Sequence, residues 1–390
     1  MKIKSQSIKL LALILFSFFS IYNGAIWGAS FSYVIIPFVL FIIAGILDPS
    51  YLKINKSLFS IFIIYIVYFF STCISNYVSI GRDFVSFLLF CVLYVIAVSF
   101  VYSEKELKTF ILCYIFIGFT VSCNICIQWI THHYMQVWLN RSSFYFLGHF
   151  KDPNYTMAYV APSVVLSIMI LFYSNIKRIR ILMIINIAVA FFSCILASSR
   201  SGVIAIGLSV VAMILFSKRI SRFTKSIIIV FVIIIISVGR YFIFNTYNEY
   251  ALNRILNDTD GGGRIEIWSC AIEVFLQNPF LGGGLNSGSE LSLATMGYTT
   301  HSIIIDIICD SGVFGTIAIL AFIYSKCIKC NKANREFFII LSLSCFVPMF
   351  FINGFNTTTI FYPIIMMSIF RNYSEKSDFS LLLGYKKTND

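Results

Sequence analysis

Long apolar runs recur along the whole chain, and they constrain its fold more than any other feature. A helix needs roughly 20 mostly apolar residues to cross a bilayer. Only 12% of the 390 residues are charged, whereas an average soluble domain contains about 25%. The sequence therefore predicts an all-α, polytopic integral membrane protein whose residues 1–390 form a single membrane-embedded domain. A set of soluble domains is excluded.

We predict about twelve transmembrane helices. The first resembles a secretory signal peptide, because Lys2, Lys4 and Lys9 precede a short apolar stretch. The eleven further spans behind it favour a retained helix instead. The predicted spans are 8–22, 31–47, 57–75, 84–102, 109–130, 155–173, 179–197, 202–217, 226–244, 301–325, 335–352 and 355–371.

The basic residues test this arrangement, because cytoplasmic loops of membrane proteins collect Lys and Arg. With the N-terminus inside and alternating spans, seven of the 29 Lys and Arg residues lie outside and the other 22 lie inside. We therefore predict that both termini are cytoplasmic. The net charge of +12 follows from the same asymmetry, so no nucleic-acid partner is expected.

The outer cations are mostly arginine, although lysine predominates on the inner side. Arginine binds phosphate or carboxylate through two parallel hydrogen bonds and keeps its charge when partly desolvated. This choice favours an anionic ligand at the outer face, and the alternative is that these side chains only reach toward the interface. The seven outer cations are Arg82, Arg141, Lys151, Arg200, Arg240, Arg254 and Arg264.

The largest outer segment, residues 245–300, lies between spans nine and ten. Within it, apolar and polar residues alternate with helical period from Arg264 to Gln277, and Asn278-Pro279 ends the pattern. We predict an amphipathic helix that lies on the membrane surface with Trp268 at the headgroup level. Its predicted apolar face consists of Ile265, Trp268, Ile272 and Phe275.

Arg264 occupies the start of this helix, after the turn Gly261-Gly262-Gly263. The free amide groups at a helix N-terminus favour an anion, and a cation there is at the unfavourable end of the dipole. The sequence thus predicts a phosphate site. The alternative is an ion pair of Arg264 with Asp258, Asp260 or Glu266.

Other polar residues lie where the chain enters or leaves the predicted spans. His301, at the entry of the tenth span, is a candidate base near neutral pH, or simply a polar anchor. Asp306 and Asp310 share one face of that span, and carboxylates inside a membrane are costly and usually functional. The short turn Ser198–Gly202 holds Arg200 at the outer surface, and Lys151-Asp152-Pro153-Asn154 leads into the sixth span.

The eleven cysteines do not indicate a disulfide framework, because nearly all lie within spans, where Cys acts as a small apolar residue. Cys327-x-x-Cys330 has the spacing of half a zinc site, but a second ligand pair is absent nearby. We predict no metal and no cofactor.

Three pieces of the sequence resemble the O-antigen polymerase and O-antigen ligase superfamily of bacterial envelope glycosyltransferases. They are the turn Ser199–Gly202, the block from Gly263-Arg264 through Trp268 and Asn278-Pro279 to Gly282-Gly283-Gly284, and Thr300-His301-Ser302 followed by Gly312-Val313-Phe314-Gly315. The element Lys151–Asn154 also fits. Together these pieces cover roughly residues 150–320.

The resemblance implies an all-helical, metal-independent glycosyltransferase of lipopolysaccharide biosynthesis in the inner membrane. Its donor is a glycan on undecaprenyl diphosphate, used at the periplasmic face among membrane lipids, with a chain-length regulator as an expected partner. Arg200 and Arg264 hold the diphosphate in this interpretation, and His301, Glu273 or Asp306 accepts the proton of the acceptor hydroxyl. The expected catalytic residues are His301, Arg264 and Arg200. The expected substrate-binding residues are Arg141, Lys151, Asp152, Asn154, Arg254 and Glu273.

Within this superfamily the sequence favours a polymerase over a ligase. Ligases often show a longer late loop and a His followed by Asn, whereas here Ser302 follows His301. A transporter or lipid-linked glycan flippase remains a further alternative, although repeated halves, which transporters commonly show, are not evident.

Overall fold

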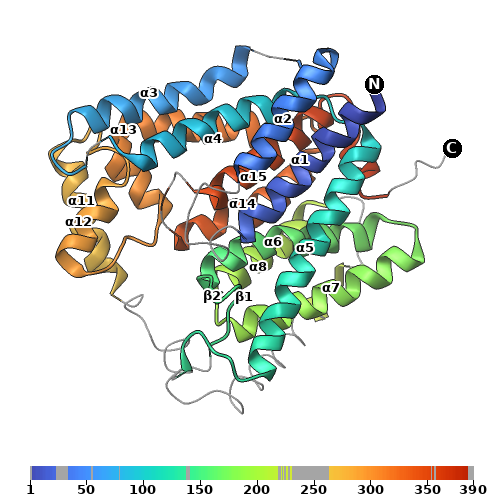
Figure 1. The fold of residues 1–390 in the computed structure, drawn as a ribbon. Helices are drawn as coiled ribbons and strands as arrows, with labels where there is room; N and C mark the ends of the chain where they lie inside the picture. Colours follow the sequence, from blue (N-terminus) through green and yellow to red (C-terminus); the bar gives the residue numbers. More distant parts are fainter. Residues whose placement is uncertain are drawn as a thin grey trace. The chain divides into compact units, whose positions relative to one another are not determined.

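The computed structural model describes residues 2–22, 34–53, 56–78, 80–137, 141–217, 263–352, 354 and 357–384, with a few positions between 221 and 230. These residues are mostly helical, with thirteen α-helices and one short β-hairpin, as expected for an all-α protein (Figure 1). Eleven of the twelve predicted spans contain a helix. The ninth, 226–244, lies almost wholly outside the described residues, so the total of twelve stays a prediction.

The helices and strands begin and end as follows. The helices are α1 Lys2–Tyr22, α2 Ile35–Leu47, α3 Ser60–Cys73, α4 Arg82–Ser99, α5 Glu104–Ile130, α6 Pro153–Tyr173, α7 Lys177–Leu196, α8 Arg200–Phe216, α11 Arg264–Gln277, α12 Ser287–Met296, α13 Ile303–Ile323, α14 Arg335–Phe346 and α15 Thr358–Ser374. The strands β1 Tyr145–Phe146 and β2 His149–Phe150 pair antiparallel, with Tyr145 opposite Phe150.

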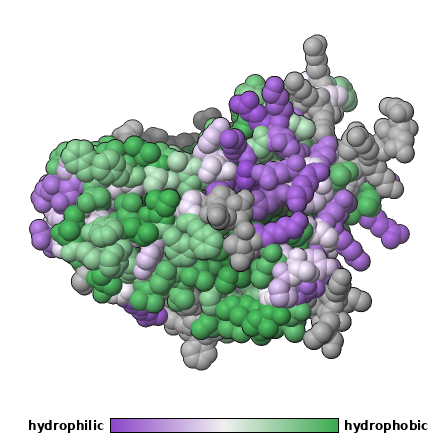
Figure 2. All heavy atoms as spheres, turned by 90° about the horizontal axis from the view of Figure 1, so that it is seen from above, coloured by the Kyte–Doolittle hydropathy of each residue, from purple (hydrophilic) through white to green (hydrophobic). Residues whose placement is uncertain are grey.

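Five helices of the described chain are long and apolar enough to cross a membrane. They are α4, α5, α6, α7 and α13 with its continuation to Ile328. Four shorter apolar helices accompany them, and wide areas of the surface are apolar (Figure 2). On α3, for example, Ile63, Ile66 and Phe70 are all exposed. Large apolar side chains exposed over such areas are typical of a protein surrounded by lipid.

The chain divides into two compact units, each made of stretches distant in sequence. Unit 1 comprises residues 1–110, 263–331 and 349–377. Unit 2 comprises residues 111–262, 332–348 and 378–390.

In unit 1, α15 supplies much of the core. Its side chains are buried on nearly every face, and Phe361 stacks on Phe90 of α4 with ring centroids 5.0 Å apart. Phe370 packs against Phe110 in a tilted arrangement, with ring centroids 6.1 Å apart. A buried ion pair joins Lys9 of α1 to Glu106 at 3.2 Å.

In unit 2, α6 is the central helix and packs against α7, α8 and α14. Small residues permit the close packing, because a Cβ on Gly202 would lie only 2.8 Å from Cβ of Met157. The sequence starts α6 clearly: Pro153 occupies its first turn, and the Asp152 carboxylate accepts the backbone N–H of Asn154 at 2.8 Å. Such a cap satisfies an amide that would otherwise lack a partner.

Helix α13 of unit 1 is interrupted at Gly312, whose φ of 60° and ψ of −161° are not helical. The segment 279–284 supplies the backbone hydrogen bonds that the interruption leaves open. Gly283 and Gly284 N–H donate to the carbonyls of Cys309 and Asp310 at 2.8 and 2.9 Å, and Val313 N–H donates to the Pro279 carbonyl at 2.9 Å. The glycines are required because a Cβ on Gly312 would lie 2.5 Å from the Phe280 carbonyl carbon.

The interrupted part of α13 and the start of α12 are hydrogen-bonded to the end of α3 and the start of α4. Ser71, near the end of α3, donates to the Asp310 carbonyl at 2.8 Å, and Asn286 donates to Asp83 in the first turn of α4 at 3.1 Å. Residues 303–309 therefore extend past those ends, beside α11 and α12. The span predicted at 301–325 contains α13, and the apolar helix that is long enough to cross a membrane extends from Ile303 to Ile328.

Candidate functional site

Arg264 is the first residue of α11, as predicted, and α11 has the predicted bounds Arg264–Gln277. The preceding Gly263 adopts φ 77°, a left-handed conformation that glycine reaches without steric cost. The Arg264 guanidinium lies over the ring of Phe351, 5.6 Å from its centroid. This cation–π contact holds the side chain in place. The alternative partners Asp258 and Asp260 lie outside the described residues.

The buried face of α11 differs from the prediction. Ile267, Ala271 and Val274 are buried, whereas Ile265 is 65% exposed. The buried face is rotated relative to the predicted apolar face because α11 packs against both α12 and α13. Helix α12 was not predicted from the sequence. The indole Nε1 of Trp268 donates to the Thr300 carbonyl at 2.8 Å, and the headgroup-level position of the ring stays a prediction.

That hydrogen bond connects the first turn of α11 to the segment that carries His301. Trp268 lies one turn after Arg264, and Thr300 immediately precedes His301. His301 is half-buried and has φ 47°, a conformation that non-glycine residues rarely adopt and that often marks functional sites. The structure thus brings the Arg264 and His301 segments together in unit 1.

Asp306 is completely buried beside this connection. Its Oδ1 accepts the hydroxyls of Ser289 at 3.0 Å and of Thr300, and its Oδ2 accepts the N–H of Gly354 at 2.9 Å. Both Asp306 oxygens are thus occupied by protein groups, and the side chain has no exposed surface through which a substrate could reach it. Of the three candidate bases, Asp306 is therefore the least suited to receive a proton from a substrate.

Asp310, one turn later and equally buried, binds the start of α12. It accepts the N–H groups of Asn286 at 2.7 Å and Gly288 at 3.2 Å, and the Ser287 hydroxyl at 3.1 Å. A carboxylate is favourable at a helix N-terminus. Both aspartates predicted to be functional membrane carboxylates thus have structural partners: Asp306 binds α12, the segment before α13 and Gly354, and Asp310 binds the start of α12.

Arg200 is the first residue of α8 in unit 2. The short turn, predicted at Ser198–Gly202, lies slightly earlier, between the end of α7 at Leu196 and Arg200. The turn is fixed by Asn154, whose Oδ1 accepts the Ser199 hydroxyl at 3.1 Å and the Ser201 hydroxyl at 3.4 Å. The structure therefore brings Asn154 together with the Arg200 turn, as expected for members of one site.

Arg141 contacts the same turn from the other side. Its Nε donates to the Ala197 carbonyl at 2.9 Å, and the Ser142 N–H donates to the Leu196 carbonyl at 3.1 Å. Asp152 caps α6, as described above. Arg141, Asp152 and Asn154 thus have structural partners around Arg200, in addition to any role with a ligand.

Lys151 lies next to the cap of α6, and its N–H donates to the Phe144 carbonyl at 2.8 Å. Its side chain keeps part of its exposed surface, yet burial lowers the pKa of Lys151 to about 8, while the Asp152 carboxylate acts in the opposite direction. An ammonium group that loses water in this way gains most from an anionic ligand.

The remaining predicted residues are less constrained. Glu273 is exposed on α11, and Arg254 lies outside the described residues. Arg264, Glu273 and His301 belong to unit 1, whereas Arg141, Lys151, Asp152, Asn154 and Arg200 belong to unit 2.

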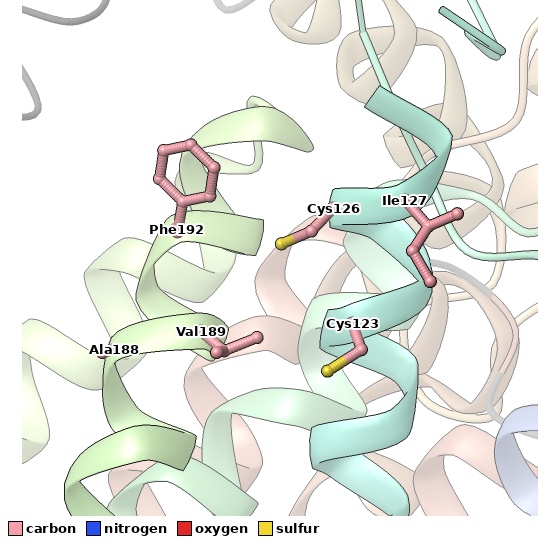
Figure 3. A pocket seen from close by; sticks show the side chains of 6 residues that line it. All are labelled: Cys123, Cys126, Ile127, Ala188, Val189 and Phe192. Atoms are coloured by element: carbon pink, nitrogen blue, oxygen red, sulfur yellow. The ribbon is translucent and has the colours of Figure 1, made fainter. Parts of the chain in front are cut away.

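An apolar groove of about 480 Å³ runs between α5 and α7 in unit 2 (Figure 3). Cys123, Cys126 and Ile127 line one wall, and Ala188, Val189 and Phe192 line the other. The side chains of Cys123 and Cys126 thus share this groove with apolar neighbours. All eleven cysteines are free thiols.

Residues 185–320 match a family model described as O-antigen ligase. This stretch is an O-antigen ligase family domain. It supports the predicted O-antigen polymerase and ligase superfamily, and it contains Arg200, Arg264, Glu273 and His301. No curated protein matches the chain.

The O-antigen ligase family domain extends from α7 through most of α13, so it takes in parts of both units. This domain includes Gly312 and the Gly282–Gly284 run, and the N–H groups of Gly283 and Gly284 donate to carbonyls of α13. The match implies a lipid-linked polysaccharide substrate and membrane lipid, and it covers polymerases and ligases alike.

Sequence reasoning missed Phe351, Gly354 and Ser289. Phe351 falls at the end of the predicted span 335–352, and Ser289 falls in the predicted outer segment 245–300, but neither was selected as a site residue. Thr300 was noted only as a neighbour of His301. The run of small and hydroxylated residues from Gly282 to Ser292 was the available signal for a tightly packed short helix, since small residues permit close approach.

Proposed function

We propose that this protein is an O-antigen polymerase, which joins oligosaccharide repeat units carried on undecaprenyl diphosphate. The observation that supports it best is the connection of Arg264 to His301: Trp268 and Thr300 link a fixed arginine at a helix start to a strained histidine. This pairing supplies a group for a phosphate leaving group and a group for a proton.

Arg264 and Arg200 are each proposed to bind phosphate oxygens of the donor. Each is the first residue of a helix, where backbone N–H groups also point outward. A cation at that position is unfavourable on its own, and a bound diphosphate removes the conflict. Fixed guanidinium groups stabilise the charge that develops as the diphosphate leaves.

In the proposed reaction, a hydroxyl oxygen of the acceptor sugar attacks the anomeric carbon of the donor sugar. A new glycosidic C–O bond forms, and the bond from the anomeric carbon to the diphosphate oxygen breaks, with the electron pair leaving on undecaprenyl diphosphate. His301 accepts the hydroxyl proton as general base. The donor carries the growing chain, and the acceptor is a new lipid-linked repeat unit.

The other predicted binding residues have different roles in this proposal, some with the ligand and some in positioning other residues. Lys151 binds the anionic donor directly, because its partly desolvated ammonium benefits from a negative charge. Arg141, Asp152 and Asn154 hold the Arg200 turn and the start of α6 in position. Glu273 contacts the acceptor sugar from the exposed face of α11, and Arg254 completes the phosphate contacts.

The proposed location is the inner membrane, with both termini in the cytoplasm and the site at the periplasmic face; the predicted distribution of 22 inner and seven outer cations supports this orientation. A chain-length regulator is the expected partner.

A ligase that transfers polymer to lipid A-core is the second candidate, since the family description is O-antigen ligase. The two activities are separated by surface glycan profiling on gels in a strain that lacks this gene. A core with one repeat unit and no ladder supports the polymerase. A bare core with long polymer still on its lipid carrier supports the ligase.

The variants for complementation are Arg264→Ala, Arg200→Lys and His301→Ala, each expected to remove the ladder. Arg200→Lys keeps the charge but not the bidentate geometry. The matched control is Arg82→Ala, because Arg82 is exposed and is also the first residue of a helix, α4. If the deletion strain keeps a normal ladder, both activities are excluded, and a flippase becomes the better explanation.

A further inference from the structure

Asp306 touches three segments of unit 1. It accepts hydrogen bonds from Ser289 of α12, from Thr300 before α13, and from Gly354 between α14 and α15. Ser289 and Thr300 also contact each other at 3.0 Å. All of these groups are buried, so the contacts are shielded from competing water.

Two of the three segments carry residues of the proposed site. Thr300 immediately precedes His301, and its carbonyl accepts the Trp268 indole N–H. Gly354 follows Phe351, the ring beneath the Arg264 guanidinium. One carboxylate is therefore bonded to both the segment that orients the histidine and the segment that supports the arginine.

We propose that Asp306 is the positioning residue that sets the geometry of His301 and Arg264 while touching neither substrate nor product. This inference rests on the proposed function. Asp306 acts through Thr300, which fixes the left-handed backbone of His301, and through Gly354, which fixes the Phe351 ring. Displacement of a catalytic group by about 1 Å can lower a rate about 100-fold.

Asp310 provides a matched control on the same helix. It is as buried as Asp306 and accepts three hydrogen bonds, but its partners are residues 286–288 at the start of α12. Loss of Asp310 contacts weakens the packing of α12 without a direct effect on the His301 or Phe351 segments.

The two asparagine variants differ in how many of the original hydrogen bonds they can keep. In Asp306→Asn, the amide oxygen can face the Gly354 N–H while the NH₂ faces the Ser289 and Thr300 hydroxyls, which also accept. In Asp310→Asn, each original oxygen faces a backbone N–H, from Asn286 or from Gly288, so one N–H loses its acceptor. Asp306→Asn should therefore retain the connection, whereas Asp306→Ala removes it.

The test measures transfer by the full-length protein in lipid nanodiscs, with lipid-linked repeat units from the deletion strain as substrate. We expect Asp306→Ala to lower kcat about 100-fold with KM changed less than about threefold, since uniform binding is retained. Asp306→Asn should recover kcat to within about tenfold of wild type, and Asp310→Asn should lower the melting temperature but leave kcat of the folded protein within about threefold.

Trp268 fluorescence gives a readout that does not depend on activity. The contribution of Trp268 is obtained by subtracting, from the emission spectrum of each variant, the spectrum of the same variant that also carries Trp268→Phe. Asp306→Ala should shift this contribution to longer wavelength because the Thr300 carbonyl moves away, and Asp310→Asn should not.

The inference is overturned if Asp306→Ala leaves the Trp268 emission unchanged, or if Asp310→Asn lowers kcat as much as Asp306→Ala. A wild-type protein without transferase activity would contradict the proposed function instead, and the Trp268 emission would still decide whether Asp306 holds the Thr300 segment.

Discussion

Replacement of Gly282 by alanine tests the pairing of segment 279–284 with the interrupted helix α13. Gly282 has φ 76°, and an added Cβ would lie 2.5 Å from the Ser311 backbone nitrogen. Gly297 is the control: its φ of 75° is almost the same, but no atom lies within 4 Å of an added Cβ. The two substitutions therefore share the backbone strain and differ only in the available space.

The expected magnitudes follow from these differences. A left-handed non-glycine residue costs about 1–2 kcal/mol, which is the whole effect expected for Gly297→Ala. At Gly282, overpacking adds about 1–3 kcal/mol. The displaced segment also loses the Gly283 and Gly284 hydrogen bonds to α13, at about 0.5–1.5 kcal/mol each, which brings the total for Gly282→Ala to about 3–8 kcal/mol.

The assay is thermal unfolding in nanodiscs at one fixed scan rate, since membrane proteins of this size often unfold irreversibly. Helix content and intrinsic fluorescence should both show a much lower midpoint for Gly282→Ala than for Gly297→Ala. Equal midpoints for the two variants would refute the reasoning, because strain alone would then account for both.

Three further predictions concern other parts of the chain. Lys9→Met should lower the unfolding free energy by about 3–5 kcal/mol, because it leaves the Glu106 carboxylate buried without its partner; a double variant with Glu106→Gln should recover most of the loss in a thermal unfolding experiment. Raising the pH through about 8 should weaken donor binding and raise KM, because deprotonation of Lys151 removes its positive charge. In Lys151→Arg the rise in KM should move to higher pH, since arginine stays charged. If the KM–pH profile of this variant equals that of the wild type, Lys151 does not bind the donor. Asn154→Ala should lower stability by about 1 kcal/mol for each lost hydrogen bond and reduce ladder formation, whereas Asn154→Asp, which keeps an acceptor for Ser199, should do neither as strongly.

The helices were predictable because long apolar runs have few other stable forms in a membrane. The bounds of α11 were also predictable, since Gly263 begins the helix and Asn278-Pro279 ends it. The short helix α12 was not, because its residues 287–296 are small and hydroxylated and show no helical apolar stripe. Its stability comes from packing and from Asp310, and both are tertiary effects that no local pattern records.

The candidate site was predicted in its residues but not in its connections. Residue type and position were enough to select Arg264, Arg200 and His301. The contact of Phe351 with Arg264 and the role of Asp306 join segments about 48 to 87 positions apart, which a local pattern cannot reveal. The two aspartates were predicted to be functional because carboxylates are costly in a membrane span, and their protein partners became clear only from the structure.

The hydrogen bonds between α3 and the interrupted helix have a consequence for the order of folding. Ser71 and its partner Asp310 are 239 residues apart, and Ser75 and Gly283 are 208 apart. Contacts of such separation form slowly, since a large loop must close first. While the ribosome adds residues 111–262, the polar groups at the end of α3 remain without their final hydrogen-bond partners. The first stretch of the chain thus begins unit 1, and residues 263–331 complete it only after most of unit 2 has been synthesised. During that period we expect chaperone or lipid contacts to protect the polar groups at the end of α3.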